Sequence, residues 1–331
     1  MDKLKETNNR FELVTCDEMS KIDKINDALY SGATQYLQKK GFLWVEVPTM
    51  TKVTGACENV DTLYALDHFG KQAYLAQTGQ LFLEAKIPSH KKVWTTITSS
   101  RAEQAVDSRH LNQFMLLEFE HAGTLDELLN NIEGTIKSMI NNALDLTHDE
   151  LKSLGRNIDE LRSFTLPFNR VTYTDAIQLL QKNGVEINWG DDFKHMHEME
   201  IIKLLGNKPT FVTHFPKKIK FFNMRVNREN EDIVNSCDLL MPYAGESVGS
   251  AEREDDYNIL VERLKDSNMY KILVKRGITL DTFKDYLDLI KNDRIFHSCC
   301  GIVFNRLSQS VLGVNDIRIT TNYPINAETL Y

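Results

Sequence analysis

The order of strand-like and helical stretches is the feature that most restricts how these 331 residues can fold. Short β-rich runs lie towards both ends of the chain, at 42–47, 74–76, 93–100, 114–120, 210–213, 233–241 and 299–304. Helical stretches with apolar faces lie mostly between them, at 21–40, 125–163, 174–182, 193–205 and 252–291. Strands and helices do not alternate regularly, which argues against a Rossmann-type parallel sheet. The pattern predicts an α+β fold with a mainly antiparallel sheet flanked by helices.

No internal repeat, linker or clear boundary divides the chain, so we expect one domain over 21–331 preceded by a loose arm over 1–20. The formal net charge of −8 argues against a nucleic-acid binder held by its overall field. Lys217, Lys218 and Lys220 could form a local basic patch, although a solubilising loop is the simpler interpretation.

The N-terminal sequence, the apolar runs and the cysteines indicate the cellular compartment of the protein. The polar N-terminus does not resemble a signal peptide and no apolar run reaches a membrane-spanning length, so no membrane association is expected. The five cysteines form no CxxC pair and, with nine scattered histidines, indicate no zinc site. They are typical of a reducing, cytoplasmic compartment.

The segment 100–120 combines groups that few structural segments need. An apolar run ends at Arg101, a polar loop carries Arg109 and His110, and a second apolar run returns with Phe114 and Glu118. Guanidinium groups bind phosphates, an aromatic ring can stack on a base, and a buried carboxylate can hold an ammonium group. The segment suits a nucleoside triphosphate beside an amino group. On its own, a hairpin with a charged tip is the simpler interpretation.

A second stretch, 238–254, carries carboxylates around a turn. Asp238 and Glu246 flank the turn, so their side chains can come close, and such hard oxygen ligands suit Mg²⁺ that bridges substrate phosphates. Small residues after the turn let the backbone approach a ligand, and Arg253 could hold a carboxylate or amide of that ligand. The structural alternative is a strand-to-helix turn with Arg253 in a surface ion pair.

Two further sets are compatible with ligand binding. Gln80 and Glu84 follow a strand end in a helix whose first turn offers free N–H groups, although helix capping by Thr78 explains the same pattern. Arg306 lies in the first turn of the expected C-terminal helix, where a cation gains nothing from the helix dipole. Its position indicates an anionic neighbour.

Taken in order, these stretches resemble the catalytic domain of class II aminoacyl-tRNA synthetases of the aspartyl/asparaginyl kind. Three motifs carry the resemblance: Gly41-Phe42 through Pro48, Ser100-Arg101-Ala102-Glu103 through Glu120, and Gly301 through Arg306-Leu307. Intervening stretches match too, including Thr78-Gly79-Gln80-Leu81, Gly245-Glu246 through Arg253-Glu254 and His297-Ser298. The resemblance covers roughly residues 20 to 325 and is specific as an ordered set.

The resemblance implies a class II synthetase-like catalytic domain that acts as an AMP-forming ligase on ATP with Mg²⁺. It implies ATP binding by a first group of residues, of which two arginines and Glu246 are catalytic: Arg101, Glu103, His110, Phe114, Glu246 and Arg306. It implies amino-acid binding by a second group: Gln80, Glu84, Glu118, Arg225 and Arg253. Asp238 and Glu246 would hold Mg²⁺, and the first motif would form a homodimer interface.

The chain also departs from the family pattern. Four positions of the second and third motifs lack their usual glycine, acidic residue or arginine: Gln113, Val303, Asn305 and Ile325. Leu83 stands where aspartyl enzymes have a lysine for the substrate carboxylate. Only about twenty residues precede the first motif, so no anticodon-binding barrel and no anticodon recognition are expected.

Three functions remain open from the sequence. The first is an AMP-forming asparagine synthetase, in which the side-chain carboxylate of aspartate attacks ATP and ammonia captures the adenylate. The second is an enzyme that activates asparagine, or a similar amino acid, and transfers it to a small molecule or protein instead of tRNA. The third is a non-catalytic relative with a regulatory or binding role. We favour the first, because relatives without an anticodon domain are of that kind, and rank the second close behind it. The third ranks lowest, because the charged site residues persist.

Overall fold

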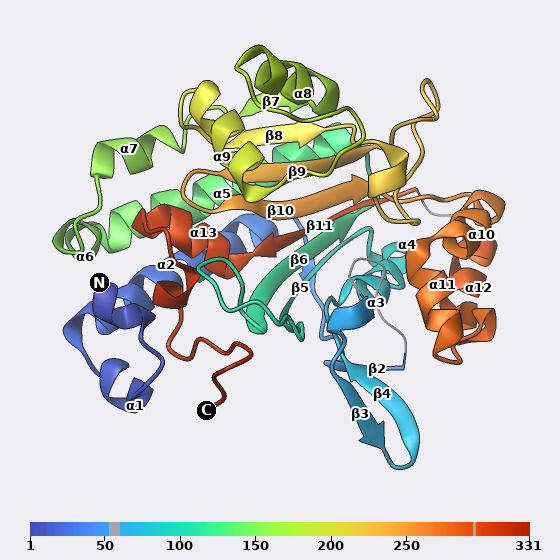
Figure 1. Cartoon of the computed structure of the whole chain (residues 1–331), viewed down its shortest axis with the longest axis horizontal. Coiled ribbons are helices and arrows are strands. Elements are labelled where there is room, and N and C mark those ends of the chain that lie inside the picture. Colours follow the sequence, from blue (N-terminus) through green and yellow to red (C-terminus); the bar gives the residue numbers. More distant parts are fainter. Residues whose placement is uncertain (53–59, 294–295) are drawn as a thin grey trace.

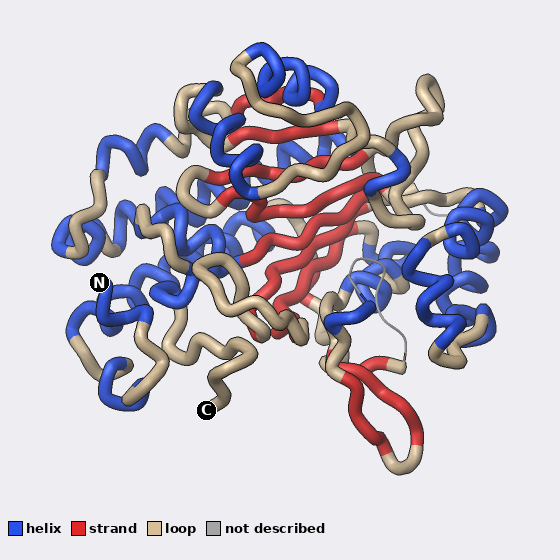
Figure 2. The backbone as a smooth tube through the Cα atoms, in the orientation of Figure 1, coloured by secondary structure: helices blue, strands red, loops and turns tan. Residues whose placement is uncertain are grey.

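A mixed eight-stranded sheet runs through the middle of the computed structural model, which describes residues 1–52, 60–293 and 296–331 (Figures 1 and 2). Its strands, in spatial order, are β1 (Leu43–Trp44), β5 (Lys92–Ser100), β6 (Gln113–His121), β11 (Ser298–Val303), β10 (Gly245–Glu252), β9 (Ser236–Met241), β8 (Thr210–Thr213) and β7 (Asn169–Thr172). The two outermost pairs run parallel and the inner pairs antiparallel. The expected α+β fold is therefore confirmed.

The centre of the sheet joins segments that lie far apart in the sequence. β6 pairs with β5 on one side and with β11, close to the C-terminus, on the other. β10 pairs with β9 and β11, so segment 245–252 is a central strand. The structural alternative of a strand-to-helix turn after residue 238 is thus wrong, because neighbouring strands on both sides complete the hydrogen bonds of a stretch rich in glycine and serine.

Two long helices cover one face of the sheet, α2 (Asp17–Lys39) and α5 (Leu125–Leu146), and both lie behind it in Figure 1. In α2 the buried residues recur at helical spacing: Ile22, Ile25, Leu29, Ala33 and Leu37. They form one core cluster with Leu117 and Phe119 of β6 and with Ile302 of β11. Because the apolar side chains of these strands point towards α2 and α5, the other face is left for polar residues.

The remaining helices lie around the sheet (Figure 1). They are α1 (Arg10–Leu13), α3 (Gln80–Glu84), α4 (Ile87–His90), α6 (His148–Ser153), α7 (Ile158–Ser163), α8 (Tyr173–Lys182), α9 (His195–Leu204), α10 (Tyr257–Asp266), α11 (Asn268–Lys275), α12 (Lys284–Asp293) and α13 (Phe304–Leu312). A small second sheet contains β2 (Met50–Thr51), β4 (Lys71–Leu75) and β3 (Ala65–His68). Within the described ranges, no helix combines the length and apolar character that crossing a membrane requires.

The first twenty residues, expected to form a loose arm, carry ordered short helices and the start of α2. Arg10 is buried, and its guanidinium group donates to the carbonyl oxygens of Leu4 at 2.8 Å, Glu6 at 3.2 Å, Thr321 and Asn322. Each of these is a hydrogen bond from a charged donor, so the side chain links the N-terminal segment to the segment after α13.

Candidate active site

The open face of the sheet carries a row of residues from four neighbouring strands. Glu118 is paired with Gly301, Gly301 with Gly249, and Gly249 with Asp238. Residues opposite each other in a sheet point to the same face, so two carboxylates stand at the ends of a row whose middle has no side chains. A Cβ atom at Gly301 or Gly249 would lie no closer than 3.7 Å to protein atoms, so these glycines leave free space above the sheet.

A cavity of about 390 Å³ lies over this row. Ten of the twelve predicted site residues line it: Gln80, Arg101, Glu103, His110, Phe114, Glu118, Asp238, Glu246, Arg253 and Arg306. Glu84 and Arg225 do not. Arg225 instead forms an ion pair with Asp255 and lies over the ring of Phe296, with the guanidinium carbon 4.8 Å from the ring centre.

Glu118 is held in place by the segment that precedes α3. The hydroxyl group of Thr78 and the backbone N–H of Gly79, at 2.8 Å, both donate to its carboxylate. Gly79 has no room for a side chain, because a Cβ atom there would lie 2.8 Å from Val47 and 3.1 Å from Glu118. Burial raises the pKa of Glu118 to about 7, although these hydrogen bonds act in the opposite direction. Thr78 therefore does more than cap a helix.

Two arginines and an aromatic ring form what we call the phosphate end of the cavity. The guanidinium group of Arg101 lies 5.0 Å from the centre of the Phe114 ring. Arg306 donates to the carbonyl oxygen of Glu246. Arg101 and Arg306 both line the cavity. Burial lowers the pKa of Arg306, and the charges of Arg109 and Arg101 contribute in the same direction. His110 lies at this end too, with Nδ1 2.8 Å from a carboxylate oxygen of Asp107.

The carboxylates of Asp238 and Glu246 come from the β9–β10 hairpin. Their cationic neighbour is Lys220, from the segment that connects β8 to β9. Nζ of Lys220 lies 2.5 Å from Oδ2 of Asp238 and 3.9 Å from the centre of the Phe215 ring. Burial raises the pKa of Asp238 to about 7, Lys220 lowers it, and the charge of Glu246 raises it. The interpretation of Lys220 as part of a solubilising loop is wrong, because its side chain is directed into the cavity lining.

The inner end of the cavity contains a buried polar cluster around Arg253. The Arg253 guanidinium donates to Sγ of Cys299 at 2.8 Å and to Oδ1 of Asn223 at 2.9 Å. The alternative of a surface ion pair for Arg253 is therefore wrong, since only 4% of this residue is exposed. Glu120 lines the cavity beside it.

Glu84 lies behind this inner end rather than in the cavity wall. Its carboxylate is 3.3 Å from Nε2 of His297 and accepts a hydrogen bond from the hydroxyl group of Tyr286 at 3.4 Å. His297 also lies 4.0 Å from Glu120. Glu120 and His297 did not stand out as site residues in the sequence. The signal was there, because Glu120 follows Glu118 by two positions and so shares its face of the strand.

The departures from the family pattern have different positions. Val303 lines the cavity, in register with Leu116, so an apolar side chain covers part of the floor there. Asn305 points away from it: Oδ1 accepts from the N–H of Met115 at 3.3 Å and Nδ2 donates to Thr320 at 3.1 Å. Leu83 is fully buried in a core cluster and supplies no cation to the cavity. In the described part of the chain, no group of three or more His, Cys, Asp or Glu residues is arranged to hold a metal ion alone.

Comparison with known proteins agrees with this geometry. Residues 2–327 match the family model described as tRNA synthetases class II (D, K and N). An asparagine–tRNA ligase of Thermococcus gammatolerans is 34% identical over 316 residues, which cover 95% of this chain and 71% of that protein. The corresponding protein of Pyrococcus abyssi is 35% identical over 316 residues, with coverages of 95% and 70%.

Solved structures superpose over nearly the whole chain. The asparaginyl-tRNA synthetase of Pyrococcus horikoshii, complexed with asparaginyl-adenylate, gives a TM-score of 0.91 at 33% identity and covers 98% of this chain and 73% of that chain. The enzyme of Entamoeba histolytica, also in complex with asparaginyl-adenylate, gives 0.87 at 28% identity, with coverages of 98% and 71%.

Proposed function

Because this chain belongs to the class II tRNA synthetases of the D, K and N group, we propose that it activates asparagine with ATP and transfers the asparaginyl group to tRNA. The expected class of enzyme, an AMP-forming ligase, is confirmed by the family. The preferred substrate differs from the one that the sequence favoured, which was aspartate with ammonia as the second substrate.

The observation that carries this proposal is the mixture of hydrogen-bonding groups at the inner end of the cavity. Within the described residues, both carboxylate oxygens of Glu120 and the amide nitrogen of Gln80 are buried without a hydrogen-bond partner. The carboxamide of asparagine offers two N–H donors and a carbonyl acceptor, so it can satisfy both kinds of group. The carboxylate of aspartate only accepts, and it would add a negative charge beside Glu84 and Glu120, where burial and the charge of Glu84 already raise the pKa of Glu120 well above its ordinary value.

The chemistry follows from the arrangement along the cavity. Glu118 binds the α-ammonium group, which leaves the α-carboxylate directed at the phosphate end. An oxygen of that carboxylate attacks the α-phosphorus of ATP, the bond from phosphorus to the bridging oxygen of the β-phosphate breaks, and pyrophosphate leaves. Arg101 and Arg306 neutralise charge on the phosphates, so the chain contributes position and electrostatics. A hydroxyl group of the acceptor then attacks the carbonyl carbon and AMP leaves.

The carboxylates near the phosphates fit a magnesium ion. Asp238 and Glu246 are close enough for the charge of one to raise the pKa of the other, which a divalent cation would relieve. Two carboxylates are a usual number of protein ligands for Mg²⁺ that also binds phosphates and water. Bound there, Mg²⁺ would withdraw charge from the phosphate oxygens.

The proposal also covers the domain organisation, the oligomeric state and the cellular compartment of the protein. We propose that residues 21–331 act as a single catalytic domain, supported by the sheet that joins β5 and β6 with β11. A homodimer is supported by β1, an edge strand whose residues Leu43 and Trp44 are about half exposed. A reducing, cytoplasmic compartment is supported by free thiols at Cys16, Cys237, Cys299 and Cys300, while Cys57 lies outside the described residues.

The test is pyrophosphate exchange with ATP, Mg²⁺ and either asparagine or aspartate, followed by aminoacylation of an asparagine tRNA transcript. We expect exchange with asparagine, little with aspartate, and labelled asparagine on the tRNA. Exchange with asparagine but no charged tRNA would direct the search to a small-molecule or protein acceptor. AMP and asparagine formed from aspartate plus ammonium would replace our proposal with the asparagine synthetase reaction, and no reaction in any mixture would favour a non-catalytic relative.

A further inference from the structure

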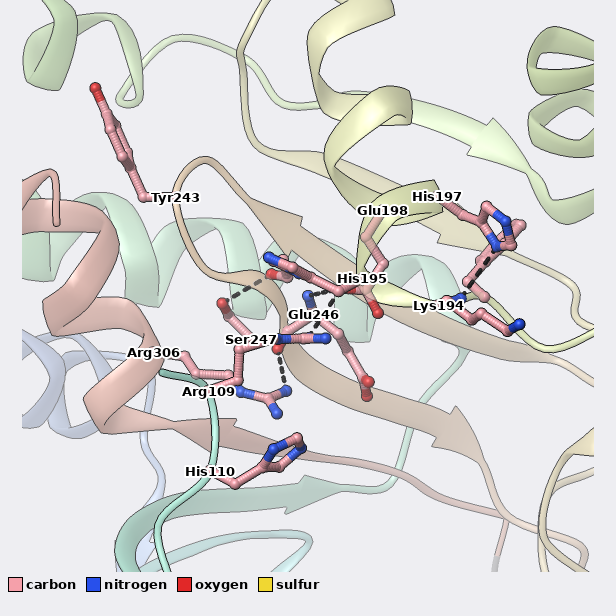
Figure 3. Close-up of polar contacts among 12 residues, drawn as sticks. Arg109, His110, Lys194, His195, His197, Glu198, Tyr243, Glu246, Ser247 and Arg306 are labelled. Carbon is pink, nitrogen blue, oxygen red and sulfur yellow. Dashed lines mark hydrogen bonds and ion pairs between the residues drawn. The ribbon is translucent and has the colours of Figure 1, made fainter. Parts of the chain in front are cut away.

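Three segments meet at one buried carboxylate that the sequence did not single out. Glu198 lies in α9 and is 5% exposed. Its Oε2 atom is 3.1 Å from a terminal nitrogen of Arg109 and accepts a hydrogen bond from the backbone N–H of Glu246 at 3.2 Å. Nδ1 of His195 lies 3.5 Å from the same oxygen. Figure 3 shows Glu198 directed from the helix towards Arg109 and Glu246.

The backbone opposite Glu198 is shaped to admit it. Gly245 has a φ of +74°, and a Cβ atom at this position would lie 2.2 Å from Oε2 of Glu198 and 3.4 Å from the guanidinium of Arg109. Only glycine combines that backbone conformation with such a short approach. The close contact between α9 and the β9–β10 hairpin therefore depends on Gly245 as much as on Glu198.

Glu198 connects two walls of the cavity. Arg109 belongs to the loop between β5 and β6, whereas Glu246 belongs to β10, and Arg306 from α13 donates to the carbonyl oxygen of Glu246. Arg109, Glu198, Glu246 and Arg306 all line the cavity. Although burial opposes ionisation, the contact with His195 and the charge of Arg109 lower the pKa of Glu198, so it remains a carboxylate.

We propose that Glu198 is a positioning residue for ATP: it fixes the guanidinium of Arg109 at the phosphate end and holds Glu246 where Arg306 contacts it. The inference rests on the proposed function. A loop arginine without this partner samples several rotamers and must lose that freedom when the nucleotide binds. Because Glu198 already orders the side chain of Arg109 in the folded protein, less side-chain entropy is lost when ATP binds. The affinity for ATP therefore gains, and the affinity for the amino acid does not.

Glu198→Gln tests the role because glutamine keeps the size of the side chain and removes its charge. We expect the KM for ATP to rise on the order of tenfold, as for the loss of one charge-assisted hydrogen bond. The KM for asparagine should change less than about twofold, since Glu118 and the inner end are untouched. Affinity for α,β-methylene-ATP, measured by calorimetry without amino acid, should fall in parallel with the effect on ATP.

The matched control is Glu200→Gln, on the same helix. Glu200 pairs with Lys203 at 3.0 Å and does not line the cavity, so its loss should leave both KM values and the analogue affinity unchanged. In an Arg109→Met background, Glu198→Gln should weaken the affinity for ATP less than about threefold, because the residue to be positioned is gone. Gly245→Ala, which displaces Glu198 by contact, should reproduce the loss of ATP affinity.

The outcomes separate the two proposals. If the wild type binds the analogue and Glu198→Gln binds it equally well, the positioning role is wrong while the proposed function stands. If Glu198→Gln lowers the thermal midpoint and weakens the affinities for ATP and asparagine alike, Glu198 is structural and the inference is again wrong. If the wild type binds neither the analogue nor asparagine, the proposed function fails, and the inference falls with it.

Discussion

At the residue scale, Glu118 shows how burial in the fold determines the protonation state of a carboxyl group. The side chain is buried on the sheet, accepts hydrogen bonds from Thr78 and Gly79, and has a pKa raised to about 7 by burial. Its ordinary value is 4.5. Between these values the folded protein holds more protons than the unfolded chain, so this group makes the protein less stable as the pH rises from about 4.5 to about 7. A bound ammonium group would offset the free-energy cost of ionising the buried Glu118.

The expected consequence is a pH-dependent affinity for the amino acid. Below pH 7 the protonated form of Glu118 predominates, so the KM for asparagine should rise, approaching tenfold per pH unit, and should level off above pH 7. Glu118→Gln should have a high KM that hardly varies with pH. The measurement is pyrophosphate exchange from pH 5.5 to 8.5 at saturating ATP. An unchanged pH profile in the variant would assign the titration to another group, such as Asp238.

Arg101 offers a test of the phosphate end. Arg101→Ala removes a guanidinium group from the wall of the cavity and should lower the rate of exchange by about a hundredfold or more. The thermal midpoint should stay near that of the wild type. Arg162→Ala is the control, because that arginine lies in α7 with 61% of its side chain exposed. A variant at position 101 that exchanges normally would remove this residue from the proposed mechanism.

Sequence reasoning identified the residues that lie on recognisable motifs and missed those that act from ordinary segments. Arg101 directly follows β5, Glu118 lies on β6 and Arg306 on α13, elements whose pattern is visible in the sequence, and all three line the cavity. Glu198 and Lys220 belong to a polar helix start and a lysine-rich loop, where charged residues usually face solvent. Only the folded chain brings them to the cavity.

At the element scale, the close contact between α2 and α5 depends on a glycine in α2. A Cβ atom at Gly32 would lie 2.6 Å from the carbonyl oxygen of Ser138 and 2.8 Å from the Cα of Met139. These are backbone atoms of α5 and cannot move independently. The hydroxyl of Ser138 donates to the carbonyl oxygen of Gly32 at 2.8 Å, which adds a polar link between the two helices.

Gly32→Ala should therefore destabilise the protein in spite of the better helix propensity of alanine. We expect the free energy of unfolding to fall by about 1–3 kcal/mol, as for other overpacked sites. Gly134→Ala in α5 is the comparison, because a Cβ atom there meets the side chain of Tyr36, which can move. Urea unfolding followed by circular dichroism gives both values. A stabilised Gly32→Ala would show that the helices separate easily.

The elements themselves were predicted unevenly. The helix expected at 21–40 is α2 (Asp17–Lys39), and the run at 93–100 is β5 (Lys92–Ser100), because each has a regular apolar pattern. β10 (Gly245–Glu252) was missed, since glycine, serine and alanine give it no alternation of polar and apolar residues. Its strand conformation comes from its neighbours β9 and β11, which a sequence pattern cannot show.

At the scale of the whole molecule, β1 leaves apolar surface at the edge of the sheet. Leu43 is 49% and Trp44 52% exposed, on a strand that pairs only with β5 among the described strands. Large exposed side chains on a sheet edge are unusual in a soluble monomer and are compatible with the proposed homodimer.

Trp44→Arg should break that dimer. A charged side chain at the centre of an apolar contact lacks a partner, so sedimentation velocity should show half the mass of the wild type at micromolar concentration. Lys40→Arg, close by in sequence at the end of α2, should leave the mass unchanged. A wild type that sediments as a monomer would end the dimer proposal.

The pairing of β6 with β11 also determines when the site can exist during synthesis. Glu118 and Gly301 lie side by side, yet β6 ends at His121 and β11 begins at Ser298. A growing chain on the ribosome must therefore carry β6 with one open edge until β11 has emerged. Such an edge is prone to pair with other chains. We expect nascent chains that stop before Ser298 to lack the floor of the cavity and to need chaperones, so that activity and solubility are gained together once β11 has emerged.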